Sequence, residues 1–320
     1  MTDPDVLYLS ELLDVPVPRL YMLSNRRRAR TPKKRLSYAN YYTVTLRSSK
    51  SGKERVLSVP NSYLKAVQRR VLNSLLYKLP VSPYATAYQP GMSLVQNAAP
   101  HAGHACILKL DISHFFDSID PDMVYPVMRE LGLSVPASVL LTNLCTCNGK
   151  LPQGAPTSPC IANLVMRRFD AQTGAWCEAR SITYTRYCDD MTFSGTAGAI
   201  RESGLLRHVR QSLSRMGFAL NQDKTLLVRS AQQQRVTGIV VNEKPALSRQ
   251  ERRRIRQEVY YCQKFGVLES LNYRSDPREP AVYLRALLGR ISYAMQIDPE
   301  QPGMRACFTA VQKMLKQENT

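Results

Sequence analysis

The chain has 320 residues, of which 44% are apolar, so it can bury a sizeable core as one large domain or two or three subdomains. Its 44 Lys and Arg against 25 Asp and Glu give a net charge of +19, which indicates a polyanionic partner, with nucleic acid ahead of an acidic membrane surface. No apolar run approaches the roughly 20 residues that span a bilayer, and the acidic N-terminus does not resemble a signal peptide, so we expect a cytoplasmic protein without a membrane partner.

The Cys and His residues do not indicate zinc. The eight Cys are scattered, and the close pair Cys145 and Cys147 has one residue between its members, not the two to four typical of a zinc knuckle. The four His show no HExxH-like spacing. We therefore expect free thiols and no zinc site.

The N-terminal part predicts helices followed by a basic segment. Residues 3–24 indicate one or two short helices, and aromatic residues interleaved with Arg follow them. Rings and guanidinium groups together favour RNA contact over a plain solvated face. The residues expected to contact RNA here are Arg26, Arg27 and Arg28.

The next elements are a hairpin and a helix. Residues 41–48 and 54–60 alternate like paired strands around the turn at residues 48–52. Apolar residues at helical spacing then predict a core helix over residues 62–79, ending before Pro80.

The central part predicts a buried strand over residues 106–111, helices over residues 121–144, and a helix beginning near Cys160. Residues 182–193 alternate as two strands around a tight turn. In the C-terminal part, Ser248 with Glu251 is typical of a capping box and Gly266 of a helix stop. Two more helices are expected, over residues 280–296 and 303–317.

Three carboxylates stand out. Asp111 ends an apolar strand, where an ionised group is costly without a cation beside it. Asp189 and Asp190 lie together at a hairpin tip, although Asp is also common in turns for local hydrogen bonding. Carboxylates that meet repel unless metal ions neutralise them, and oxygen ligands select Mg²⁺ or Mn²⁺. Two such ions ~4 Å apart can activate a hydroxyl and stabilise a leaving oxygen in phosphoryl transfer.

Three segments around these carboxylates form motifs. They are Tyr187-Cys188-Asp189-Asp190, the segment from Leu108 to Phe116, and the segment from Leu151 to Pro159. The first resembles the Tyr-x-Asp-Asp box of the reverse transcriptase family, with Cys where related enzymes usually have Ala. The second is similar to the first catalytic strand of that family, and the third to its Pro-Gln-Gly-x-x-x-Ser-Pro loop. Their order and spacing match the family, and the resemblance implies an RNA-directed DNA polymerase.

The resemblance also implies a fold and a set of roles. The fold is α+β, a right-hand polymerase with fingers, a palm of antiparallel sheet and helices, and a helical thumb. The implied boundaries are 1–36 for an N-terminal helical basic segment, 37–104 for the fingers, 105–243 for the palm with finger and palm helices at 121–150, and 244–320 for the thumb.

The implied site has two Mg²⁺ ions, with Mn²⁺ as an alternative. The metal ligands are Asp111, the backbone carbonyl of Ile112, Asp189 and Asp190, and Lys224 is expected to protonate the leaving pyrophosphate. Phe116 is expected to exclude a 2′-hydroxyl, and Gly154 to let backbone approach a nucleotide. The substrate-binding residues are Lys53, Arg55, Phe116, Gln153, Gly154 and Tyr187. Surface charge is the alternative for Lys53 and Arg55, a core aromatic for Phe116, and a solvated turn for Lys224.

Two short signatures resemble the retron branch of the family. Asn97-Ala98-Ala99-Pro100-His101 is similar to its Asn-Ala-x-x-His segment, and Val236-Thr237-Gly238 to its Val-Thr-Gly segment. Arginines also crowd the first turns of the helix after Ser248, where the helix dipole disfavours cations and an external anion would relieve the conflict. The residues expected to hold structured RNA are Asn97, His101, Val236, Thr237, Gly238, Arg252, Arg253 and Arg256.

The retron resemblance implies several partners. The first is a cognate structured non-coding RNA (msr-msd), part of which is copied into DNA with an internal guanosine 2′-hydroxyl as primer. The others are its branched DNA product (msDNA), dNTPs, a host ribonuclease H, and an effector or toxin protein in anti-phage defence. Three alternatives stay open. They are a group II intron-like reverse transcriptase, an RNA-directed RNA polymerase, and an RNA or msDNA-binding scaffold that restrains an effector.

Overall fold

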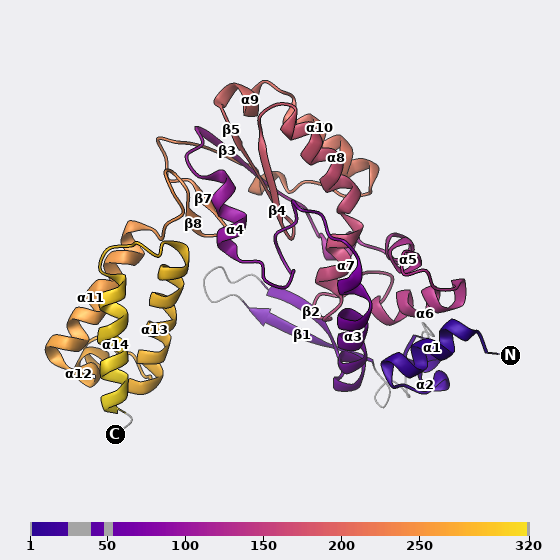
Figure 1. The fold of residues 1–320 in the computed structure, drawn as a ribbon, viewed down its shortest axis with the longest axis horizontal. Coiled ribbons are helices and arrows are strands. Elements are labelled where there is room, and N and C mark those ends of the chain that lie inside the picture. The colour runs from indigo at the N-terminus through magenta and orange to yellow at the C-terminus, as the bar shows by residue number, and fades with distance from the viewer. Residues whose placement is uncertain (1, 25–39, 48–53, 319–320) are drawn as a thin grey trace. The chain divides into compact units, whose positions relative to one another are not determined.

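The computed structural model describes residues 2–24, 40–47 and 54–318, which form two compact units (Figure 1). Each unit is assembled from three stretches of the chain. The first contains Met1–Met92, Lys109–Thr192 and Arg201–Leu226, and the second contains Ser93–Leu108, Phe193–Ile200 and Leu227–Thr320. Helices and antiparallel strands are mixed along the chain, so the predicted α+β class is confirmed. The boundaries of fingers, palm and thumb stay a prediction.

Two short helices begin the chain, as predicted. In α1 (Pro4–Leu13), the Asp3 side chain caps the first turn by accepting hydrogen bonds from the backbone N–H groups of Asp5 and Val6. The second helix is α2 (Val17–Ser24). The basic residues Arg26, Arg27 and Arg28 lie outside the described residues.

The predicted hairpin is confirmed. Strands β1 (Tyr41–Arg47) and β2 (Glu54–Pro60) pair antiparallel. The turn between them, with Lys53, lies outside the described part of the chain. Helix α3 (Ser62–Ser74) follows and ends before the predicted position, because Leu75 leaves helical geometry and a short 3₁₀ turn, η2 (Leu76–Lys78), replaces the last turn.

A four-stranded sheet carries the acidic motifs. Its order is β4 (Thr183–Tyr187), β5 (Asp190–Gly195), β3 (Cys106–Asp111) and β6 (Leu226–Arg229). The sheet therefore places β3 beside β5, so the strand that ends in Asp111 is a neighbour of the strand that begins at Asp190.

The first unit also contains several helices. The predicted helical region after Pro121 consists of α5 (Pro121–Arg129) and α6 (Val135–Cys145), and the helix expected near Cys160 is α7, which begins at Ser158. The sequence did not predict α8 (Arg167–Glu178) or α10 (Leu205–Arg215). Figure 1 labels these helices, α5 to α8 and α10.

The second unit contains short elements and a C-terminal helical bundle. The short elements are α4 (Leu94–Ala98), η3 (Ala99–His101), α9 (Ala197–Arg201, whose last residue belongs to the first unit), β7 (Arg235–Val236) and β8 (Ile239–Val240). The bundle consists of α11 (Arg249–Phe265), α12 (Val267–Tyr273), α13 (Pro280–Ile297) and α14 (Met304–Glu318) (Figure 1).

The bundle confirms three predicted helices and adds α12. Ser248 caps α11 by accepting from the backbone N–H of Glu251, and Gly266 ends the helix at φ +86°. Its four helices share a core that includes Ile255, Leu271 and Leu284. Within the described residues, we find no helix with both the length and the apolar character needed to cross a membrane.

Candidate active site

A cavity of about 540 Å³ in the first unit gathers the residues that the acidic motifs indicated. Asp111, Asp189 and Asp190 all line it, although 78 positions separate the first from the second. The other lining residues include Arg55, Tyr88, Ile112, Phe116, Gln153, Asn221 and Lys224. Residues distant in sequence therefore face one space.

Backbone hydrogen bonds fix the end of β3 in this cavity. The N–H of Ile112 donates to the carbonyl of Asp189 at 3.1 Å, and the N–H of Asn221 donates to the carbonyl of Asp111 at 2.8 Å. The segment after β3 is thus held both by the turn with the paired carboxylates and by the segment that leads to Lys224. Such bonds are the usual way in which a buried strand end satisfies its backbone groups.

The carboxylates crowd one another. The pKa of Asp190 is raised, first by desolvation and then by the charge of Asp189. The charge of Asp111 raises it further, whereas that of Lys109 lowers it. Part of the Asp190 side chain nevertheless reaches solvent. A bound cation would relieve this repulsion, and carboxylate oxygens are the ligands that Mg²⁺ and Mn²⁺ prefer, so the donor set fits the expected metal. This fit concerns the chemistry of the donors, because among the described residues no group of three or more His, Cys, Asp or Glu side chains is arranged to hold a metal ion.

Lys224 neutralises part of this charge. Its Nζ lies 2.6 Å from Oδ2 of Asp111, whose side chain is 6% exposed. The hydrogen bond to Asp111 raises the pKa of Lys224, and the charges of Asp189 and Asp190 contribute in the same direction. Lys224 therefore remains an ammonium group, which can donate a proton but cannot act as a base.

Three of the six predicted substrate-binding residues line the same cavity, whereas Tyr187 and Gly154 do not, and Lys53 lies outside the described residues. Arg55 of β2, Gln153 and the half-buried Phe116 line the cavity. Tyr187 does not, but its ring lies 6.3 Å from that of Tyr88, which does.

Gly154 approaches protein backbone. A Cβ atom there would lie 3.1 Å from the carbonyl oxygen of Ser58 in β2, and its φ of +122° also favours glycine. The N–H of Ser58 donates to the carbonyl of Gln153 at 2.9 Å, so this loop is fixed against β2. The expected approach of Gly154 to a nucleotide stays a prediction.

A buried ion pair supports the turn with the two Asp residues. The side chains of Arg186 and Asp170 are both fully buried, and the guanidinium group donates to both carboxylate oxygens, at 2.8 and 2.6 Å. It also donates to the carbonyl of Cys188 at 2.9 Å and to Oδ1 of Asn163 at 3.1 Å. Because Cys188 lies at φ +62°, this contact holds the residue before Asp189 in an uncommon conformation.

The sequence analysis did not find this ion pair. Arg186 is a charged residue within a strand of otherwise buried side chains, Tyr184 and Thr185, and that was the available signal. Asp170 lies in α8, which was not predicted, so no local pattern indicated its partner.

The two retron-like signatures meet in the second unit. The Asn97 side-chain amide donates to Oγ1 of Thr237 at 3.3 Å, and Nδ1 of His101 lies 2.7 Å from Oγ of Ser194. Asn97, His101 and Val236 are buried, whereas Gly238 is exposed and Thr237 half-buried, both with positive φ. The buried side chains therefore stabilise the segment, and its accessible part is the turn at Thr237 and Gly238. Contact of this turn with RNA stays a prediction.

His101 makes this segment sensitive to pH. Burial, followed by the charge of His104, lowers the pKa of His101 to about 3. Above pH 6.5 the ring is neutral in both folded and unfolded chains, but as the pH falls from about 6.5 towards 3 only the unfolded chain takes up the proton, so stability is lost.

We expect the wild-type protein to lose roughly 1.3 kcal/mol of unfolding free energy through His101 between pH 7.5 and pH 5.5. His101→Asn removes this loss. The difference in unfolding free energy between the wild-type protein and the variant is therefore smaller at pH 5.5 than at pH 7.5, by that amount. Urea unfolding of both proteins at the two pH values measures it. A difference that does not change with pH would contradict the assignment.

The predicted RNA-binding arginines lie on α11. Arg253 and Arg256 are exposed, whereas Arg252 is half-buried and donates to Oε1 of Gln301 at 2.7 Å. The first two thus keep their guanidinium groups available. Contact of these three with RNA stays a prediction.

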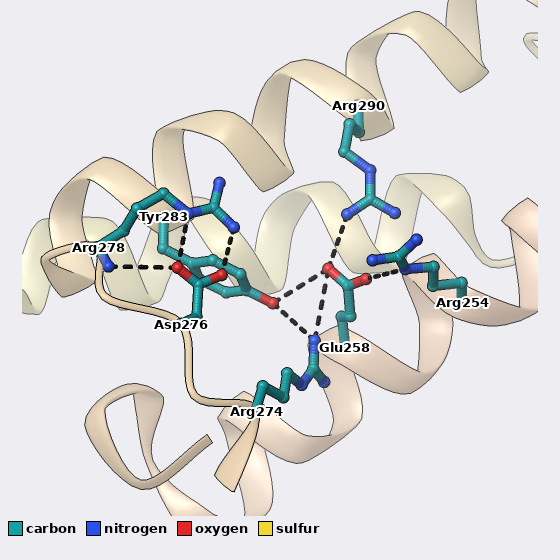
Figure 2. Close-up of polar contacts among 7 residues, drawn as sticks. All are labelled: Arg254, Glu258, Arg274, Asp276, Arg278, Tyr283 and Arg290. Atoms are coloured by element: carbon teal, nitrogen blue, oxygen red, sulfur yellow. Dashed lines mark hydrogen bonds and ion pairs between the residues drawn. The ribbon is translucent and has the colours of Figure 1, made fainter. Parts of the chain in front are cut away.

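A buried glutamate organises other arginines of the bundle. Glu258 accepts from Nε of Arg254 at 2.9 Å, from Arg290 at 2.7 Å and from the Tyr283 hydroxyl at 3.0 Å (Figure 2). Burial alone would raise the pKa of Glu258, but these hydrogen bonds and the charge of Arg290 outweigh it and hold the pKa below its usual value. The carboxylate is therefore ionised and fixes several cations.

The fold and the cavity define the class of the protein. A family model described as reverse transcriptase (RNA-dependent DNA polymerase) matches residues 33–241, and the chain belongs to this family. Within it, the chain belongs to the retron reverse transcriptases. It is 34% identical over 282 residues to the retron Mx65 reverse transcriptase of Myxococcus xanthus and 34% identical over 236 residues to the retron Ec86 reverse transcriptase of Escherichia coli.

These similarities extend over most of the chain. They cover 82% of it for the Mx65 enzyme and 71% for the Ec86 enzyme. The matched regions make up 62% of the length of the Mx65 enzyme and 72% of the length of the Ec86 enzyme. The Ec83 reverse transcriptase of Escherichia coli is 29% identical over 82% of this chain and 84% of its own length.

Proposed function

We propose that this protein is the RNA-directed DNA polymerase of a retron. It copies part of a cognate structured non-coding RNA into DNA, with an internal guanosine 2′-hydroxyl as primer, and the product is a branched RNA-DNA molecule. The observation that carries the polymerase activity is the shared cavity of Asp111, Asp189, Asp190 and Lys224. The retron assignment rests on the similarity to named retron enzymes.

The carboxylates are suited to a metal-dependent transfer. In the proposal, Asp111, Asp189, Asp190 and the backbone carbonyl of Ile112 hold Mg²⁺, or Mn²⁺ in its place. When bound, a pair of such cations activates the primer hydroxyl and stabilises the leaving oxygen. The close approach of Ile112 to Asp189 supports this set, because it brings the backbone after β3 to the turn that carries the other two ligands.

The other cavity residues hold the incoming nucleotide. Arg55 pairs with its triphosphate, and Gln153 hydrogen-bonds to the template or to the incoming base. Lys224 donates its proton to the leaving pyrophosphate. The hydrogen bond to Asp111 raises the pKa of Lys224, so the side chain carries the proton that this step needs.

The ring of Phe116 selects deoxyribonucleotides. It lies on the cavity wall five residues after Asp111, the last residue of β3, where a ring against the sugar would collide with a 2′-hydroxyl. Phe116→Ala is expected to lower the preference for dNTPs over rNTPs by roughly tenfold or more, whereas Phe116→Tyr keeps the ring and the preference. Primer extension with each nucleotide type measures the ratio, and an unchanged ratio in Phe116→Ala would remove Phe116 from this role.

The second unit holds the structured RNA. In the proposal, Thr237, Gly238, Arg253 and Arg256 contact its backbone, since they are the predicted RNA-binding residues whose groups remain accessible. Recognition relies on shape and phosphates more than on sequence. A host ribonuclease H that removes the template and an effector protein restrained during phage defence complete the proposal; both follow from the retron family alone.

Sequencing the nucleic acid that copurifies with the protein from its own cells tests this function. We expect one RNA species joined to a DNA strand that is complementary to part of the same RNA. Copurification of unrelated RNA without DNA would contradict the retron assignment, and synthesis of RNA in place of DNA on a supplied primed template would contradict the polymerase assignment.

A further inference from the structure

Aromatic side chains are unusually exposed where α11 and α12 meet in the second unit. Tyr273 is 87% exposed and Phe265 53%. Together with Tyr261, Glu269 and Ser270 they line a cavity of about 410 Å³, a volume typical of small-ligand sites. Exposed apolar surface around a cavity marks a binding site more often than a random surface does.

The hinge at Gly266 creates this cavity. Gly266 ends α11 at φ +86° and directly precedes α12. The rings of Tyr261 and Phe265 on α11 therefore line one cavity with the ring of Tyr273 on α12. The rings of Tyr261 and Phe265 have their centroids 5.9 Å apart at an interplanar angle of 34°, one helical turn from each other. Tyr273 completes the wall from the end of α12.

Two cations lie beside these rings, and one of them, Arg274, is held in place. Nζ of Lys264 is 5.1 Å from the centroid of Phe265, and the guanidinium carbon of Arg274 is 5.9 Å from that of Tyr261. Tyr283 and Glu258 hold Arg274 in place. The guanidinium group of Arg274 donates to the Tyr283 hydroxyl at 3.0 Å and lies 3.6 Å from the Glu258 carboxylate (Figure 2).

We propose that this cavity binds an unpaired nucleobase of the nucleic acid that the protein carries, an inference that rests on the proposed function. The rings offer flat faces for base stacking, and the neighbouring cations offer the charge that the flanking phosphate needs. Glu269 is the acidic group in the wall, and its carboxylate accepts a hydrogen bond from an imino or amino group of the base.

The observations favour a nucleobase over an apolar segment of a protein. An aliphatic partner needs no cations beside the rings, and it gains nothing from a carboxylate in the wall. The chain as a whole carries a net charge of +19, which favours a polyanionic partner over an uncharged one. Stacking tolerates any base, so the site reads the absence of pairing and not the sequence.

Photocrosslinking of the full-length protein tests the proposal. The probe is a single-stranded RNA decamer of uridine with one 5-bromouridine, and peptide mass spectrometry locates the attachment. We expect crosslinks at Tyr261, Phe265 or Tyr273, reduced at least about tenfold by Phe265→Leu with Tyr273→Leu, which keep apolar volume but remove the rings. Phe265→Tyr with Tyr273→Phe is expected to retain them.

Leu268→Ala is the matched control. Leu268 lies on α12, as Tyr273 does, and it is 59% exposed, but it does not line the cavity. A blunt-ended RNA duplex of two complementary strands, which has no unpaired bases, should not compete for these crosslinks. Absence of wild-type crosslinks in α11 and α12, or equal yield in the double Leu variant, would overturn the proposal. DNA synthesis on a supplied primed template is measured in parallel, so a failure of the cavity and a failure of the polymerase function give different results.

Discussion

Asp189→Ala is expected to abolish DNA synthesis, with a rate at least about 10³-fold lower, and to leave RNA binding nearly intact. The side chain lies in the same cavity as Asp111 and Lys224. Removing it takes away one of the few oxygen ligands available to the cations, whereas the proposed RNA contacts are on the second unit. Primer extension on an RNA template measures the first effect, and a gel-shift titration with the copurified RNA measures the second.

Asp223→Ala is the matched control for this substitution. Asp223 is an exposed acid in the short turn that carries Lys224, but it does not line the cavity. The same change of charge there should leave synthesis within about twofold of wild type, since exposed charges contribute little. Substantial synthesis by Asp189→Ala would remove Asp189 from the metal site.

Asp170→Ala is expected to cost about 3–5 kcal/mol of unfolding free energy, because it leaves the Arg186 guanidinium buried without its counter-charge. Both side chains are fully buried, so water cannot replace the lost carboxylate. The same guanidinium holds the Cys188 carbonyl, so the turn before Asp189 loses its support as well. Urea unfolding followed by circular dichroism measures the loss.

The ion pair of Arg167 with Glu130 supplies the comparison. It has similar geometry, at 2.6 Å, but its side chains are 28% and 40% exposed. Glu130→Ala should therefore cost no more than about 1 kcal/mol. If Asp170→Ala were as mild as Glu130→Ala, the buried pair would not be what stabilises the Asp189 turn.

Patterns with local causes were predictable from the sequence. The buried strand that ends at Asp111, the hairpin tip at Asp189, and the cap and stop of α11 at Ser248 and Gly266 each depend on residues close in the chain. The meeting of Asp111 with Asp189 and Lys224 was predicted only through the family resemblance, because no periodicity indicates which strand ends are neighbours.

Other features depend on distant partners and could not be predicted. Arg186 appears as an ordinary charged strand residue until Asp170 of α8 is placed against it. His101 and Asn97 were interpreted as RNA contacts, but the structure buries both, and their polar groups bond to Ser194 and Thr237. Burial of polar side chains with satisfied hydrogen bonds is a tertiary property that composition does not reveal.

Binding of Mn²⁺, followed by electron paramagnetic resonance in the presence of a dNTP and a primed template that lacks a terminal hydroxyl, tests the central claim most directly. The account predicts saturable binding by the wild-type protein and by Asp223→Asn, and loss of that binding when Asp111→Asn and Asp189→Asn are combined. Equal Mn²⁺ binding by all three proteins would contradict the claim that these carboxylates hold the catalytic cations.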